Sequence, residues 1–459
     1  MVFSWARGLG AVALGSLLAC SGAGDVTIGP PPPAAPASGG GAPSDTTAPN
    51  GLKFPEVLSR GGPVIVTPVV LPILFQGDKN LAHVKALTEG LARDPYWSSV
   101  ASEYGVGPMR AHAPVVMSPA PTGQIKSGDI EKWLKEKLTD GTFGAPDPSW
   151  LYAVYLPAGV QIVEEQSGGK SCDAFAGFHY EIEARNVRVG YAVIPDCGDL
   201  AELAVSASHE YFEWATDPFP DSKPAYNKLT PEHWAWEATM AGELSDLCDF
   251  MDHDHFVPAG VGYPVQRQWS NKLSRAGAFP CAPRKDVPYV QAVAAADDAA
   301  LVPDYTTAVN LTTKAIRVPA GGTRVIDVNV YSDEPAQGIA LDAQSYDQMI
   351  GNASTMGYSF ALSKKTASSG EVVKLEVKAP TASAFDLVVL SARVGSETHY
   401  WPVLVVNDDA AAPTRGVASV TRRDLGRFRG MPDAPRLNRA RMLWRRDPFQ
   451  KRAATPAAR

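Results

Sequence analysis

The chain has 459 residues, of which 45% are hydrophobic and 20% are charged, and its formal net charge is -7 at pH 7. This composition excludes a wholly disordered chain, and the length is sufficient for two domains. An acidic body is not expected to bind nucleic acid.

The first 19 residues are predicted to be a lipoprotein signal peptide. Arg7 precedes an apolar run over 9–18, and the run 17–20, Leu-Leu-Ala-Cys, matches the sequence at which bacterial lipoprotein precursors are cleaved. The apolar run is too short to span a membrane. We therefore expect a mature chain that starts at Cys20 and is anchored by a lipid there to the outer membrane or cell surface. An ordinary secretory signal is the alternative.

Both ends of the mature chain have compositions that do not favour a packed core. Residues 20–51 are rich in Gly, Pro, Ala, Ser and Thr and are expected to form a disordered tether. Residues 408–459 contain 13 Arg or Lys and 5 Asp, a charge of +8, so that the remainder carries -15. We expect a basic, disordered tail, which could lie on an anionic surface or on the acidic body, or stay solvated without a partner.

Residues 52–288 are predicted to form an α+β domain. Amphipathic patterns over 80–93 and 127–138 indicate helices. A further helix is predicted from about 199 to 216, because Asp217 precedes a proline and a residue in that position avoids helical backbone angles. Four short apolar runs are typical of buried strands: 64–66, 69–71, 151–156 and 189–194.

The helix predicted over 199–216 contains a candidate metal-binding motif. His209, Glu210 and Glu213 form the sequence His-Glu-x-x-Glu, and residues four apart lie on one face of a helix. A catalytic zinc ion needs three protein ligands, an open position for water and a nearby carboxylate to take the proton. We therefore assign His209 and Glu213 as metal ligands and Glu210 as the catalytic base. A surface helix with an ordinary polar face is the alternative. The apolar residues fall on the opposite side of the helix: Leu200, Leu203, Ala204, Ala207, Tyr211 and Trp214.

The third ligand must come from another segment. Glu243 and Asp246 share one face of a short predicted helix, and we assign Glu243 as the third ligand and Asp246 as the acid that orients the histidine ligand. The reverse assignment is the alternative. Asp217 could add another oxygen, although its expected role is to end the helix.

Other donors and other metals remain open. His179 is an alternative nitrogen ligand, and His253 and His255 are weaker ones, because a lone histidine is more often structural. Two glutamates and one histidine make a harder site than zinc usually has. Zinc is therefore the expected ion, with manganese or calcium as alternatives.

Four cysteines remain besides Cys20. An even number in an exported protein favours disulfides, with three possible pairings. We expect Cys172 to pair with Cys197 and Cys248 with Cys281, since these pairs close short loops. A four-cysteine zinc site is the alternative, and the lack of a Cys-x-x-Cys sequence argues against it.

Residues 289–407 change to an alternating pattern. Apolar residues at 326, 328 and 330, and again at 373, 375 and 377, alternate with polar ones. Short alternating strands separated by Gly, Pro and Ser predict an immunoglobulin-like β-sandwich. We expect a structural or adhesive accessory domain there.

Five sequence blocks between Val64 and Cys281 occur in an order that resembles a known family. They are Gly-Phe-His ending at 179, the run 191–197, the run 208–218, the run 242–248 and the run 265–271. This order resembles the EXORDIUM, or phosphate-induced, protein family of plants and its bacterial relatives. The resemblance implies an exported, zincin-like domain with a metal site, and the plant members are described as cell-wall signalling proteins. Tyr211 and Phe212 are bulkier than the small aliphatic residues typical of these positions in the family.

Together these features predict an α+β protein, with a zincin-like metallohydrolase domain followed by the β-sandwich. The expected function is that of an exported bacterial lipoprotein with a peptidase-like domain acting on a peptide or a cell-surface polymer. The alternative is a non-catalytic surface binding or adhesion protein, with a structural metal or none. A glycosidase using Glu210 and Glu213 is less favoured, because carboxylates three apart on one helix rarely flank a sugar bond.

Overall fold

The described part of the chain lies within one unit, Thr47–Arg459. The predicted signal peptide, Cys20, the tether as far as Asn50 and most of the predicted tail lie outside the described residues. The computed structural model describes residues 51–165, 168–249, 251, 254–304, 310–349, 354, 356–382, 384–408 and 418–419.

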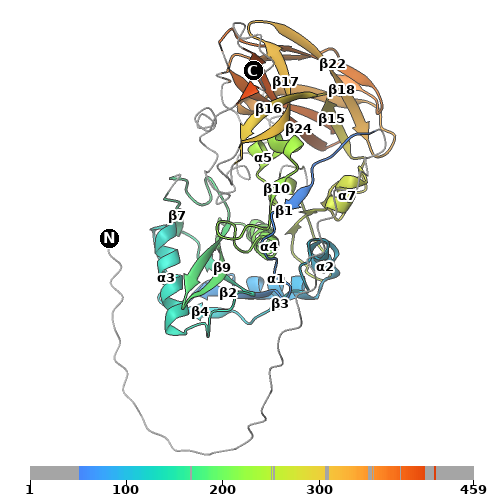
Figure 1. The fold of residues 1–459 in the computed structure, drawn as a ribbon. Helices are drawn as coiled ribbons and strands as arrows, with labels where there is room; N and C mark the ends of the chain where they lie inside the picture. Colours follow the sequence, from blue (N-terminus) through green and yellow to red (C-terminus); the bar gives the residue numbers. More distant parts are fainter. Residues whose placement is uncertain are drawn as a thin grey trace, which may run out of the picture. The chain divides into compact units, whose positions relative to one another are not determined.

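A six-stranded sheet forms the base of the α/β part (Figure 1). Its strands are β2 (Val69–Phe75), β3 (Arg110–Ala111), β4 (Val115–Met117), β6 (Trp150–Leu156), β8 (Phe178–Ala184) and β9 (Val187–Pro195). The order is β3-β2-β6-β9-β8, with β4 also paired to β2, and all pairs are parallel except that of β8 with β9. Every residue of β2 is buried, as expected for a parallel strand covered on both faces. Strand β8, the last in this order, forms one edge of the sheet.

Helices α1 (Leu81–Arg93), α3 (Ser127–Asp140) and α4 (Leu200–Thr216) pack against this sheet. The other helices of the α/β part are α2 (Pro95–Ala101), α5 (Trp234–Met240), α6 (Asp246–Asp249) and α7 (Asn271–Arg275), with short 3-10 helices η1 (Ser102–Tyr104) and η2 (Pro231–His233). The apolar side of α3 packs on one face, where Leu134 shares a core with Tyr152. On the other face Leu203 of α4 shares a core with Ala153. The strands predicted over 151–156 and 189–194 and the three predicted helices are confirmed.

The segment Val64–Val66, predicted to be a strand, is a connection instead. Its residues form no ladder, and Val66 is 65% exposed. The Ile65 N–H donates to the Ala215 carbonyl of α4 at 2.9 Å. Flanking prolines, which lack an N–H, explain why this apolar run does not join the sheet.

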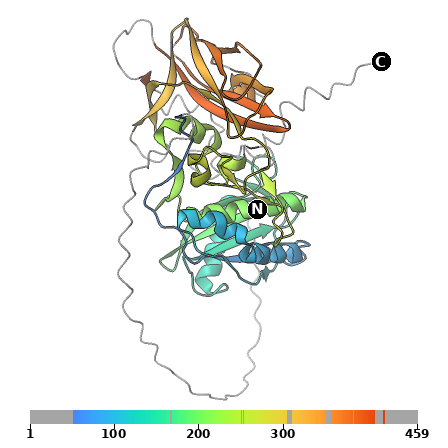
Figure 2. The same ribbon diagram turned by 90° about the vertical axis from the view of Figure 1, so that its right-hand side faces the viewer.

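The C-terminal part is rich in β-strands, so the chain as a whole is a mixed α+β protein. One sheet has the order β15-β18-β22-β20 and the other the order β21-β19-β23-β24-β17-β16-β25, and Figure 2 shows these strands in colours from yellow to red-orange. Their bounds are β15 (Val290–Ala294), β16 (Asp298–Pro303), β17 (Asn310–Pro319), β18 (Thr323–Ser332), β19 (Ile339–Ser345), β20 (Ser359–Leu362), β21 (Thr366–Ala367), β22 (Val372–Lys378), β23 (Phe385–Val394), β24 (Glu397–Asp408) and β25 (Ala418–Ser419). Burial alternates along β22, which confirms the predicted period of two there. The short helix α8 (Tyr346–Met349) follows β19.

Buried aromatic rings join the α/β part to the β-rich part. The ring centroids of Phe54 and Trp401 are 5.7 Å apart, and those of Trp236 and Trp401 are 5.3 Å apart. Lys285 forms a buried ion pair with Glu397 at 2.5 Å. The two parts therefore share one continuous hydrophobic core.

Short two-stranded sheets and two disulfides connect segments outside the main sheets. The small sheets pair β1 (Val57–Ser59) with β10 (Tyr226–Leu229), β5 (Gln124–Lys126) with β7 (Gln161–Val163), β11 (His255–Phe256) with β12 (Val265–Gln266), and β13 (Gln268–Trp269) with β14 (Cys281–Ala282). The predicted disulfides are confirmed: Cys172 bonds Cys197, and Cys248 bonds Cys281. Among the described residues, no helix has both the length and the apolar character needed to cross a membrane.

Candidate metal centre

Helix α4 places His209, Glu210 and Glu213 in the interior of the α/β part. The helix begins where the Asp199 side chain accepts the N–H of Ala201 at 2.8 Å. From Leu203 to Thr216 every residue is buried, so the polar face of the helix is as enclosed as its apolar face. The surface-helix alternative is therefore wrong. Leu200, predicted to belong to the apolar stripe, is 48% exposed because it lies in the first turn.

His209 faces two carboxylates with one ring nitrogen and an amide with the other. Its Nε2 lies 3.0 Å from Glu213 Oε2 and 3.6 Å from Asp246 Oδ1. Its Nδ1 lies 2.7 Å from Gln266 Oε1. Gln266 Nε2 donates to the Ser245 carbonyl at 2.7 Å, which directs the amide oxygen toward His209. Nδ1 of His209 then donates to the amide, and Nε2 is the ring nitrogen directed at the carboxylates, where a metal ligand would lie.

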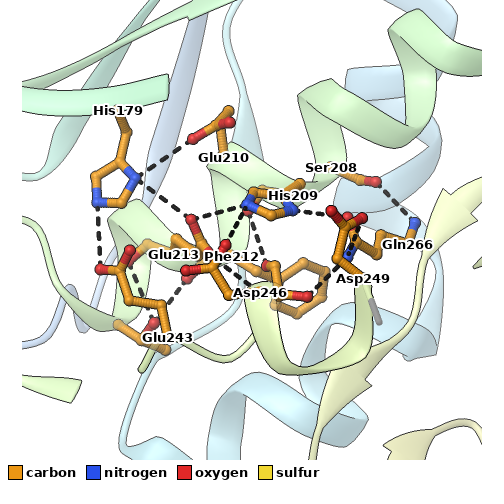
Figure 3. A network of polar contacts seen from close by, with 12 residues as sticks. His179, Ser208, His209, Glu210, Phe212, Glu213, Glu243, Asp246, Asp249 and Gln266 are labelled. Atoms are coloured by element: carbon orange, nitrogen blue, oxygen red, sulfur yellow. Dashed lines mark hydrogen bonds and ion pairs between the residues drawn. The ribbon is translucent and has the colours of Figure 1, made fainter. Parts of the chain in front are cut away.

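His179 approaches the same carboxylates from β8. Its Nδ1 lies 3.4 Å from Glu210 Oε2 and 3.6 Å from Glu213 Oε2, and its Nε2 lies 3.8 Å from Glu243 Oε1. The ladder that pairs His179 with Ala192 of β9 holds this side chain at the sheet edge. Figure 3 shows Glu213 between the two histidine rings.

Two glycines allow the chain to pass close to the site. A Cβ on Gly177 would lie 2.7 Å from Glu210 Oε1, and a Cβ on Gly242 would lie 2.5 Å from the Asn227 carbonyl oxygen. Neither distance is compatible with an unshifted neighbour. Gly177 therefore makes room for the Glu210 carboxylate, and Gly242 lets the segment before Glu243 approach β10.

Asp217 ends α4 as predicted, and its carboxylate accepts two hydrogen bonds. Oδ1 accepts the N–H of Ala225 at 2.6 Å, and Oδ2 accepts from Asn227 Nδ2 at 2.7 Å. These bonds hold the segment that leads from the end of α4 into β10. Asp217 thus has a structural role beside the centre.

Six buried carboxylates, which we call the carboxylate cluster, surround the two histidines. They are between 0% and 8% exposed: Glu210, Glu213, Asp217, Glu243, Asp246 and Asp249. Burial raises the pKa of Glu213, Glu243 and Asp246 well above the ordinary range, and neighbouring carboxylates in the cluster raise it further. Burial alone would lower the pKa of His179, but its hydrogen bond to Glu210 and the nearby negative charges outweigh burial and raise it. The cluster therefore takes up positive charge readily, as protons or as a metal cation.

The unpaired atoms of the cluster fit a metal ion better than protons alone. His179 Nε2, Glu210 Oε1 and Glu243 Oε1 are buried and have no hydrogen-bond partner. Two sets of donor atoms, each with all atoms within 4.8 Å of one another, could hold an ion: His179 with Glu213 and Glu243, and His209 with Glu213 and Asp246. One imidazole and two carboxylates suit zinc or manganese, and calcium less well, since calcium prefers oxygen ligands alone.

The structure distributes the predicted site residues differently from the predicted roles. Glu243, assigned beside His209, belongs to the donor set of His179, whereas Asp246 faces Nε2 of His209. The side chain that contacts the other nitrogen of His209 is Gln266, for which no role was predicted. An uncharged amide has no charge that would mark it as a ligand, although Gln266 lies in the last of the five sequence blocks. His255 is half exposed and pairs with its neighbour Asp254, and His253 lies outside the described residues.

Comparisons with known proteins give no family for this chain. No family model and no curated protein matches it. Among solved structures, the match to S-layer protein SbsC domains 4 and 5 has 12% identity, a TM-score of 0.16, and covers 22% of this chain and 57% of that chain. The match to the titin M3 domain has 8% identity, a TM-score of 0.15, and covers 26% of this chain and 96% of that chain. At these TM-scores the likenesses carry no argument about function, so the candidate centre rests on its own geometry.

Proposed function

We propose that this protein is an exported, metal-dependent hydrolase of the peptidase type, with a zincin-like α/β part. The observation that carries the proposal is the arrangement on α4. His209 and Glu213 point donor atoms at one position, and Glu210 stands beside them with one carboxylate oxygen unpartnered. A carboxylate next to a metal position is what general-base activation of water requires.

The chain's own residues have distinct roles in this proposal. When bound, a divalent ion supplies Lewis-acid chemistry, because it polarises a carbonyl and makes water more acidic. His209, oriented by Gln266, and Glu213 with Asp246 would hold the ion. Glu210 accepts the proton of the attacking water at its free Oε1 and returns it to the leaving amine. His179, 3.4 Å from Glu210 Oε2, orients that carboxylate.

The cellular setting is part of the proposal. Two disulfides support an oxidising, extracytoplasmic compartment. The lipoprotein signal and Cys20 then anchor the protein at the outer membrane or the cell surface, where its substrate is a peptide or a peptide-containing surface polymer. Membership of the EXORDIUM-like family remains part of this proposal, on the sequence blocks that include Gly177 and Gly242.

The test combines metal content with turnover. Purified full-length protein is measured by elemental analysis and against a peptide library, beside the Glu210→Gln and Glu183→Gln variants. We expect Glu210→Gln to retain the metal and lose turnover, because the amide cannot accept the proton. Glu183→Gln, which changes an exposed glutamate of β8, should behave as wild type. Wild-type protein without metal, or a Glu210→Gln variant with undiminished turnover, refutes the proposal.

A non-catalytic surface protein with a structural ion is the second candidate function. The observation that favours it is burial, since His209 and Glu210 are each only 1% exposed. Structural zinc sites are closed, whereas catalytic ones keep an open position. Under this alternative, Glu210→Gln leaves the ion in place and there is no turnover to lose in the wild type.

A further inference from the structure

The donor atoms of the centre form two sets that share a single residue, Glu213. We propose that the centre holds two divalent ions, with the Glu213 carboxylate bridging them. His209 and Asp246 complete one position, and His179 and Glu243 complete the other. This inference deepens the proposed function and rests on its metal site, but it concerns the number of ions and not the reaction.

The position of Glu213 Oε2 is the geometric basis of the proposal. This oxygen lies 3.0 Å from His209 Nε2, and the Glu213 carboxylate also belongs to the donor set of His179, in which all donor atoms lie within 4.8 Å of one another. Donor atoms around an ion with bonds of about 2.0–2.2 Å are expected roughly 3–4 Å apart. The second oxygen, Oε1, accepts the N–H of Asp246 at 3.1 Å, which fixes the carboxylate between the two histidines.

Apart from the shared Glu213, each position has its own ligands from separate elements. The first draws on α4 and on Asp246 at the start of α6, and the second on β8 and on Glu243 in the segment before α6. Neither donor set contains both histidines. A single ion bound by His179 and His209 together is therefore not the arrangement that the donor atoms favour.

Charge supports two ions over one. The six members of the carboxylate cluster carry -6 when ionised, so one divalent ion leaves -4 and two leave -2. Within the described residues, the ion-pair partners of Glu213, Glu243 and Asp246 are histidines and not lysines or arginines. Buried charge without a counter-charge strongly disfavours the folded state.

An unpartnered nitrogen points to the second position independently of the acidic residues. His179 is 4% exposed, and its Nε2 has no hydrogen-bond partner although it is directed toward Glu243 Oε1 at 3.8 Å. A buried imidazole nitrogen without a hydrogen-bond partner is unfavourable unless an ion or another ligand contacts it. An ion between His179 and Glu243 would satisfy both atoms at once.

The experiment counts ions and asks whether they are adjacent. Full-length protein is stripped of metal, loaded with Mn²⁺, and examined by elemental analysis and electron paramagnetic resonance. We expect two ions per chain with an exchange-coupled spectrum, because ions in shared sites lie about 3.5–4 Å apart. His179→Gln and His209→Gln should each retain one ion with an uncoupled spectrum, while His255→Gln, which changes a half-exposed histidine, should retain two.

The outcomes separate this inference from the proposed function. One uncoupled ion per wild-type chain, lost in both His179→Gln and His209→Gln, overturns the two-ion centre and leaves the hydrolase proposal standing. Two ions that both persist in His179→Gln overturn the assignment of the second position. No ion in the wild type overturns both proposals. The wild-type spectrum decides the number of adjacent ions even where a variant fails to fold.

Discussion

Removal of the Cys248–Cys281 disulfide should lower both the stability of the protein and its affinity for metal. The bond links α6 to β14, and both cysteines are fully buried. It joins residues separated by 33 positions, for which loop-closure entropy gives about 3.7 kcal/mol at 25 °C. Because Cys248 follows Asp246 by two residues, the double variant Cys248→Ala with Cys281→Ala should also loosen that ligand.

The other disulfide provides a matched control. Cys172 and Cys197 are separated by 25 positions, for which the same relation gives about 3.5 kcal/mol, so the two double variants should lose similar free energies of unfolding in urea. Their metal affinities should differ, since the β8–β9 ladder holds His179 without help from Cys172. Calorimetric titration with Mn²⁺ should show the larger loss of affinity in the Cys248 variant. Equal losses of affinity, or a stability loss below about 1 kcal/mol in either variant, would refute this reasoning.

Three further changes test the surroundings of the centre. Burial raises the pKa of Glu237 to about 7 from its ordinary 4.5, so its contribution to stability is present below pH 4.5 and lost as the pH rises through 7. Glu237→Gln should therefore raise the free energy of unfolding by up to about 3 kcal/mol above pH 7 and little near pH 4.5, whereas Glu232→Gln, a partly exposed control, should change it little at either pH. Gly177→Ala should displace Glu210 and reduce turnover about 100-fold with the metal retained, and loss of the metal would contradict the stated role of that glycine. Burial lowers the pKa of His233 to about 4 from 6.5, so stability is lost as the pH falls from 6.5 toward 4. Between pH 6.5 and pH 4, the free energy of unfolding should fall by up to about 3 kcal/mol more in wild type than in His233→Asn, as measured by denaturation at the two pH values.

Local signals in the sequence predicted the elements that carry the site. The apolar period of α4, the capping residue Asp199 and the Asp-Pro pair at its end all act within a few residues, so the helix bounds could be predicted closely. The two disulfides were predictable because each joins cysteines close in the chain. The one strand that failed, over 64–66, is flanked by prolines, which exclude it from a ladder.

The contacts within the site could not be predicted in the same way, because they depend on the sheet order. His179 reaches Glu213 because β8 pairs antiparallel with β9 at the edge of the sheet and contacts α4. No local pattern specifies that edge. The role of Gln266 depends on β12 lying against α4, and an amide carries no charge that would mark it as a site residue. In the same way, the apolar period of α4 indicates which of its faces is polar, but it does not indicate that the polar face is buried.

The carboxylates of the cluster are held in fixed positions, and this affects how their charge can be neutralised. Repulsion between buried carboxylates opposes folding, and flexible ligands would relieve it by moving apart. Here they cannot, because Glu213 is held by the Asp246 N–H, Asp217 by two donors from the segment before β10 and from β10, and α6 by the Cys248 disulfide. Protons or a cation relieve the repulsion in such a rigid arrangement, and the binding free energy of a cation would include that relief. Such fixed positions suit the proposed ion site, since protons neutralise the carboxylates one at a time whereas a cation would contact several of them together.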